Sequence, residues 1–97
     1  MAELCWEPAA AAAYAALDAM PQRLGEAVEV VLDLLEADPG DRAVRRRSRR
    51  TSQGDAIWKV DIRGSTDGWT LLWIEHPTSP GDVLILYLGP SAYPWHP

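Results

Sequence analysis

The sequence has few of the residues that cross-link small proteins or hold metal ions. It contains one cysteine, Cys5, and two histidines among 97 residues. A single cysteine excludes a disulfide within the chain, and two widely spaced histidines do not have metal-ligand spacing. A glycine-rich phosphate loop and a nucleophile elbow are also missing. The sequence therefore predicts no metal and no other cofactor.

Long apolar runs and a basic leader are missing as well. The longest apolar stretches, around Ala9–Leu17 and Val83–Leu88, are shorter than the roughly 20 residues of a membrane span. The chain starts with the acidic Met1-Ala2-Glu3, and its one cysteine is typical of a reducing compartment. We therefore expect a cytoplasmic protein that does not associate with a membrane.

The length and composition are those of one globular domain. An apolar fraction of 47% and a charged fraction of 24% are ordinary for a folded protein. A chain of this size buries roughly 60–65% of its unfolded surface, which is enough for one modest core. We expect residues 1–97 to form a single domain.

Positive charge is concentrated in the middle of the chain. The net charge is −5, but residues 1–41 carry nine acids and one base, whereas residues 42–63 carry eight bases and two acids. The basic segment could bind an RNA or another polyanion, or its arginines could pair with the acidic helices of the same chain. Both interpretations stay open for the five clustered arginines, Arg45, Arg46, Arg47, Arg49 and Arg50.

The N-terminal part predicts a short strand followed by two helices. Leu4–Trp6 is apolar, and Pro8 then suits the first position of an alanine-rich helix that extends to about Ala19. A second helix begins at Pro21 and ends at the turn Asp38–Asp41. Its apolar residues recur at helical spacing: Leu24, Val28, Val31 and Leu35. The short connection makes the two helices antiparallel neighbours.

The remainder of the chain predicts strands. Residues 44–51 suit an edge strand or a mobile loop, because arginines fall on both alternating faces. Ile57–Arg63 alternates apolar and charged residues, and Trp69–Glu75 follows after a glycine-containing turn. Val83–Leu88 is apolar on both faces, as in a central strand, and Gly89-Pro90 ends it.

Together these elements predict an α+β fold, with an N-terminal helical hairpin packed on a small antiparallel β-sheet. The residues expected to face the helices are Trp58, Val60, Ile62, Trp69, Leu71 and Trp73. The five tryptophans are better explained as core than as a platform for stacking nucleotides. Trp95, beside His96, is the exception.

Several segments together resemble the RelE/ParE superfamily of bacterial toxins. They are Trp6–Ala9 at the first strand–helix junction, the helix end Leu32–Pro39, the hairpin Ile57–Trp73 and the final Leu86–Gly89. The resemblance covers nearly the whole chain and implies the RelE/ParE-like version of this fold. It also implies a toxin of a type II toxin–antitoxin system, held inactive by a cognate antitoxin protein.

The resemblance to RelE implies ribosome-dependent cleavage of messenger RNA without a metal. Lys59 and Arg63 correspond to basic residues of the first hairpin strand, and Tyr93 and His96 could serve as acid or base from the tail. Thr70 occupies a position where RelE-type enzymes carry an arginine. Read from the sequence alone, Lys59 and Arg63 could instead pair with Asp61 or Glu75.

Three functions remain open at this point. The chain could be a RelE-like endoribonuclease that contacts the ribosome and mRNA, or a ParE-like inhibitor of DNA gyrase. It could also be an interaction module with the RelE fold but without RNase activity. The sequence does not determine the oligomeric state.

Overall fold

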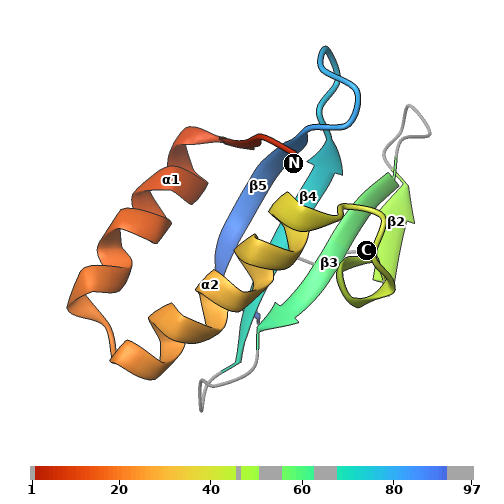
Figure 1. Ribbon diagram of the computed structural model, residues 1–97. Coiled ribbons are helices and arrows are strands. Elements are labelled where there is room, and N and C mark those ends of the chain that lie inside the picture. The colour runs from red at the N-terminus through yellow and green to blue at the C-terminus, as the bar shows by residue number, and fades with distance from the viewer. Residues whose placement is uncertain (1, 46, 51–55, 63–67, 92–97) are drawn as a thin grey trace.

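Two helices lie across one face of a five-stranded sheet (Figure 1). The computed structural model describes residues 2–45, 47–50, 56–62 and 68–91, and for residues 47–50 it describes the backbone alone. The strand order is β1-β5-β4-β3-β2. This confirms the predicted α+β class with an N-terminal helical pair.

The first helix is shorter than its alanine-rich sequence predicts. α1 covers Pro8–Ala15, with Pro8 in the first turn, and the chain then tightens into the 3₁₀ turn η1, Ala16–Ala19. Met20 precedes Pro21 and is extended, with φ −101° and ψ 166°. A residue before proline avoids the helical region, which explains why the helix tightens and ends here.

The second helix provides most of the helical contribution to the core. α2 covers Gln22–Ala37, and its buried residues follow the predicted spacing: Leu24, Val28, Val31, Leu32 and Leu35. Its last turn holds the start of the chain, because the backbone N–H of Ala2 donates to the carbonyl of Glu36 at 2.8 Å. This bond secures β1, Leu4–Trp6, beside the helical layer.

Strands β3, Ala56–Ile62, and β4, Trp69–Glu75, form the predicted central hairpin. Their register pairs Trp58 with Trp73 and Val60 with Leu71. All six residues that were expected to face the helices belong to the core or pack against it, which confirms that prediction. β4 is the middle strand, and its first five residues are buried on both faces.

The sheet is mixed, so the prediction of an antiparallel sheet is wrong for its first strand. β1 pairs with β5, Val83–Pro90, in parallel, with Leu4 opposite Val83 and Trp6 opposite Ile85. α1 and α2 carry the chain from β1 over the sheet to β2 at the opposite edge, and β3 and β4 then lead back to β5. A short strand can pair in this direction because its partner is already held by β4 on the other side.

The last strand differs from its sequence-based prediction in two ways. It lies between β1 and β4, one place from the centre, and it continues through Gly89 and Pro90 instead of ending there. β1 pairs only with residues 83–85, so at Pro90 the described chain provides a neighbour on the β4 side alone. Proline has no backbone N–H group to donate to a neighbouring strand. It is tolerated at this position because no described strand lies on the other side to accept such a bond.

A register shift in β5 interrupts the regular alternation of this strand between its two faces. Leu72 pairs with Tyr87 and Trp73 with Ile85, which leaves Leu86 as the extra residue of a bulge. Val83, Ile85 and Leu88 therefore all reach the core. In the described part of the chain, no helix is long and apolar enough to cross a membrane.

Candidate functional site

The arginine-rich segment forms an edge of the sheet. β2, Arg47–Arg50, follows the 3₁₀ turn η2, Arg42–Val44, and within the described chain it pairs with β3 alone. The register sets Arg47 opposite Lys59 and Arg49 opposite Ile57. Of the two interpretations of residues 44–51, the edge strand is therefore correct for 47–50. Charged residues on such an edge hinder pairing with other chains.

Lys59 lies on the sheet face opposite the helices, and its side chain is only 12% exposed. Its Nζ atom lies 3.9 Å from Oδ1 of Asp61, whose side chain is 50% exposed. The two residues are two positions apart on β3 and so share a face. Pairing with Asp61, one of the alternatives open for Lys59, is therefore present in the structure.

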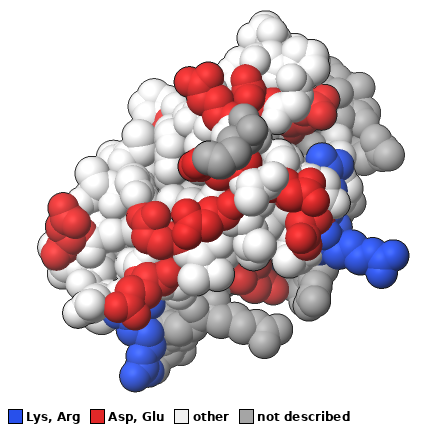
Figure 2. Space-filling model, in the orientation of Figure 1, with Lys and Arg blue, Asp and Glu red and all other residues white. Residues whose placement is uncertain are grey.

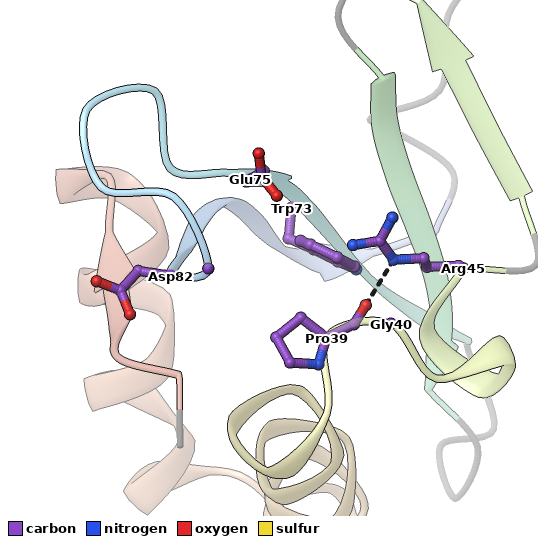
Figure 3. Close-up of a pocket in the computed structure, with 7 residues that line it drawn as sticks. Pro39, Gly40, Arg45, Trp73, Glu75 and Asp82 are labelled. Carbon is purple, nitrogen blue, oxygen red and sulfur yellow. Dashed lines mark hydrogen bonds between the residues drawn. The ribbon is translucent and has the colours of Figure 1, made fainter.

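Arg45 separates from the rest of the arginine cluster and turns toward the helix-facing core. Its Nε donates to the carbonyl oxygen of Pro39 at 2.6 Å (Figure 3). Its guanidinium carbon lies 5.0 Å from the ring centroid of Trp58 and 5.2 Å from that of Trp73. Half-buried between a carbonyl and two rings, this guanidinium group is fixed in place by hydrogen bonding and cation–π attraction.

The backbone that carries Arg45 is itself held at two points. The carboxylate of Asp41 accepts a hydrogen bond from the N–H of Ala43 at 2.8 Å and caps η2. The indole Nε1 of Trp73 donates to the carbonyl of Val44 at 3.0 Å, and both residues are fully buried. The conformation of Arg45 therefore depends on the packing of β4.

Four of the predicted site residues cannot be placed. Arg46, Arg63, Tyr93 and His96 lie outside the described residues. Arg47, Arg49 and Arg50 are placed by their backbone in β2. The described part of the predicted site therefore comprises the β2 backbone, Lys59 and Arg45, and it divides between two sides of the sheet.

Thr70 has a structural role at the position where the resemblance led us to expect an arginine. Its side chain is fully buried, and its Oγ1 lies 2.7 Å from the Oγ of Ser91. The two hydroxyl groups satisfy each other at the end of β5. A long cationic side chain at this position would have to displace that bond.

The helical side of the molecule is acidic. Figure 2 shows a band of carboxylates across it, and the acidic residues of α2 are Glu26, Glu29, Asp33 and Glu36. Tyr14 stacks on Trp6 with ring centroids 4.9 Å apart, and its hydroxyl donates to the Glu29 carboxylate. That bond, then burial and the nearby carboxylates, raise the pKa of Tyr14 to about 12. This face therefore repels polyanions.

Asp82, in the turn between β4 and β5, connects this turn to β1. Its carboxylate accepts hydrogen bonds from the Ser79 hydroxyl and, at 2.9 Å, from the backbone N–H of Glu3. These two bonds, in that order of importance, lower the pKa of Asp82 below its usual value of 3.8. The ionised carboxylate therefore stabilises the fold above that pH, and the contribution disappears as the pH falls below it.

We accordingly expect Asp82→Asn to unfold at lower urea concentration than the wild type at neutral pH. The difference should shrink as the pH falls through the range below 3.8, where the wild-type carboxylate takes up its proton. Urea unfolding followed by tryptophan fluorescence across the acidic range measures this. Ser79→Ala removes the main donor and should weaken the same pH dependence. A difference that grows toward low pH would contradict the assignment.

Sequence reasoning missed two features of these surfaces. One is the stacking of Arg45 on the two tryptophans, which depends on where the loop after α2 returns to the sheet. The other is a crevice of about 440 Å³ near Trp6 and Tyr14, whose rim includes Glu29, Asp33 and Glu36. The spacing of these three acids predicts that they share one face of the helix, but it does not predict a crevice beside them.

The described residues contain no group of three or more histidine, cysteine, aspartate or glutamate side chains that could hold a metal ion. Comparison with known proteins finds no matching family model, no matching curated protein and no matching solved structure.

Proposed function

We propose that this chain is a toxin of the RelE/ParE superfamily that acts on RNA through the basic edge of its sheet. The observation that carries the proposal is the position of β2. Three arginines, Arg47, Arg49 and Arg50, lie on a strand that among the described residues pairs on one side only, with the strand that bears Lys59. The helical side is acidic, so an RNA chain would approach this edge.

The order of elements adds support. A short strand, two helices, a basic connector and a hairpin follow one another as the resemblance implies. In a RelE-like reaction, the 2′-oxygen of one nucleotide bonds to the adjacent phosphorus while the bond to the 5′-oxygen of the next nucleotide breaks. A base takes the proton of the 2′-hydroxyl, and an acid donates a proton to the leaving 5′-oxygen.

In this proposal, the chain supplies each role from its own residues. Lys59 and Arg63 would stabilise the charge that develops on the phosphate. Tyr93 and His96 would serve as the acid and the base. Arginines of β2 would bind flanking phosphates, which fixes the RNA without reading its sequence. The ribosome with its mRNA is the proposed target, the cytoplasm the proposed location, and an antitoxin the proposed partner.

Two observations favour a second candidate, a relative that acts by binding alone. Lys59 is mostly buried and lies beside Asp61, and Thr70 is buried where a catalytic arginine would be expected. A ParE-like gyrase inhibitor or a RelE-fold interaction module would need no RNA chemistry at these positions. The two candidates differ in whether RNA is cut.

Regulated expression in a bacterial host tests the proposal. We expect the wild-type chain to stop growth and Arg47→Gln/Arg49→Gln/Arg50→Gln to restore it, whereas Arg23→Gln, an exposed arginine outside the edge, should leave the arrest unchanged. Primer extension on mRNA from arrested cells should show cuts within codons at the ribosomal A site. Arrest without cuts would favour the second candidate, and normal growth with the wild type would contradict both toxin assignments.

Binding of single-stranded RNA to the purified protein provides a quantitative readout. The logarithm of the affinity falls with the logarithm of salt concentration by about 0.7 for each phosphate contact. The magnitude of this slope should therefore be smaller by about 2 for the triple variant than for the wild type, and it should be unchanged for Arg23→Gln. Equal slopes for all three proteins would show that β2 does not contact RNA.

A further inference from the structure

A small pocket lies at the end of the sheet beside Arg45, on the side of the helices. It has a volume of about 200 Å³, and its walls come from the loop after α2, from the end of β4 and from the β4–β5 turn. Figure 3 shows the lining residues Pro39, Gly40, Arg45, Trp73, Glu75 and Asp82. The space suits one small chemical group rather than a whole nucleotide.

Arg45 offers the pocket a cationic group that is held but not neutralised. Its Nε is used by the carbonyl of Pro39, and no carboxylate of the described residues lies within ion-pair distance of its guanidinium group. The two Nη atoms are the donors that remain. Since Trp58 and Trp73 fix the plane of the group, little side-chain freedom is lost when a ligand binds.

Two acidic residues line the pocket, and neither of them pairs with Arg45. The Asp82 carboxylate points away from Arg45, and its oxygens already accept bonds from Glu3 and Ser79 (Figure 3). Glu75 lies at the exposed end of β4 and does not pair with Arg45. The lining of the pocket therefore combines one guanidinium group with the apolar ring of Pro39, and the buried ring of Trp73 lies directly under the guanidinium group.

We infer that this pocket binds a single carboxylate group, held end-on by the two Nη atoms of Arg45. A planar carboxylate matches the guanidinium fork with two parallel hydrogen bonds. A phosphate group matches it too, but it carries close to two charges at neutral pH. Glu75 and the acidic helical side would repel it more strongly, so the surroundings favour the monoanion.

Such a carboxylate can come from the end of a peptide chain or from a small organic acid. Both sources present the same carboxylate group. The end of a peptide chain also has an amide next to the carboxylate, whereas a simple organic acid does not. This inference does not rest on the proposed function, because the pocket lies on the opposite side of the sheet from Lys59. A protein without any toxicity could still bind a carboxylate here.

Nuclear magnetic resonance on the intact chain tests the inference directly. The indole Nε1–H of Trp73 and the Nε–H of Arg45 are both hydrogen-bonded beside the pocket and serve as reporters. We expect N-acetylglycine to shift both signals with a saturable curve and a Kd on the order of millimolar. N-acetylglycinamide, which lacks the charge, should leave them unchanged at the same ionic strength.

Three variants separate binding from folding. Arg45→Gln should weaken N-acetylglycine binding at least tenfold, and Arg45→Lys, which keeps the charge but loses the fork, should weaken it severalfold. Glu75→Gln should tighten binding about two- to fivefold by removing a repelling charge. The amide spectrum of each variant reports whether it is folded, and the Glu75 variant tests the pocket even if both Arg45 variants unfold.

The remaining outcomes each decide the inference. Propionate that binds as well as N-acetylglycine supports a site for small acids, and tighter N-acetylglycine supports a peptide end. Inorganic phosphate that binds more tightly than either would overturn the choice of a carboxylate. Linear shifts that chloride reproduces, or undiminished binding by folded Arg45→Gln, would show that Arg45 has only a structural role.

Discussion

Replacement of Trp73 by alanine is expected to lower the free energy of unfolding by about 3–5 kcal/mol, as for other fully buried aromatic residues. Trp73 has no exposed surface, lies on the central strand and packs 6.2 Å from Trp58 between ring centroids. Its indole also bonds the buried carbonyl of Val44. A domain of this size has a total stability of about 5–15 kcal/mol, so the variant should be marginal.

Urea unfolding followed by circular dichroism measures this loss, and two further variants identify its origin. Trp73→Phe keeps most of the ring but leaves the Val44 carbonyl without its donor, which should cost about 1–3 kcal/mol. Met20→Ala, at a residue that is 42% exposed, should change stability by less than about 0.5 kcal/mol. Equal stability of Trp73→Phe and the wild type would show that the indole bond contributes nothing.

Leu35→Ala is expected to cost about 2–5 kcal/mol, because it opens a cavity under the last turns of α2. Leu35 has no exposed surface and belongs to the core beneath the helical layer. The same turn of α2 provides the carbonyl that accepts from Ala2. The variant should therefore also loosen the start of the chain, which faster amide exchange at Ala2 would report.

Val30 provides a matched control on the same helix. It is 60% exposed, so Val30→Ala removes two methyl groups from solvent rather than from the core. Its effect should stay within about 0.5 kcal/mol, and it could be slightly stabilising because alanine favours helix. A thermal unfolding midpoint that falls equally for both variants would contradict the predicted position of the core.

The elements with strong periodicity could be predicted from the sequence. α2 repeats its apolar residues at helical spacing, and β3 alternates Trp58, Val60 and Ile62 with charged residues. In both elements the apolar residues lie on one face, and that face packs on the core. The spacing of the apolar residues therefore predicts both the type of element and its buried face. The pairing of β3 with β4 also followed, because the intervening turn is short.

Features that depend on distant parts of the chain could not be predicted in this way. The parallel direction of β1 depends on β5, and the continuation of β5 through Pro90 depends on how short β1 is. Neither cause is present in the local sequence. The bulge at Leu86 likewise follows from the pairing with β4, although the apolar character of both faces was visible beforehand.

The candidate site could be predicted only as a segment of positive charge. The sequence identified the arginines, but it could not show that Arg45 stacks on Trp58 and Trp73 while Arg47–Arg50 form an edge. Arg45 and the first residue of β2 are only two positions apart, and the contacts that hold Arg45 come from Pro39, Trp58 and Trp73, none of which is its neighbour in the sequence. The burial of Lys59 could not be predicted from the local sequence either, because it depends on the strands that pair with β3 on both sides.

The parallel pairing of β1 with β5 also determines when the molecule can finish folding. The backbone partners of residues 4–6 are residues 83–85, so β1 has no strand to pair with until β5 has been synthesised. Contacts of such large sequence separation form slowly. Translation must therefore pass Ile85 before the amino-terminal strand can enter the sheet, and the native topology is completed late rather than built outward from its beginning.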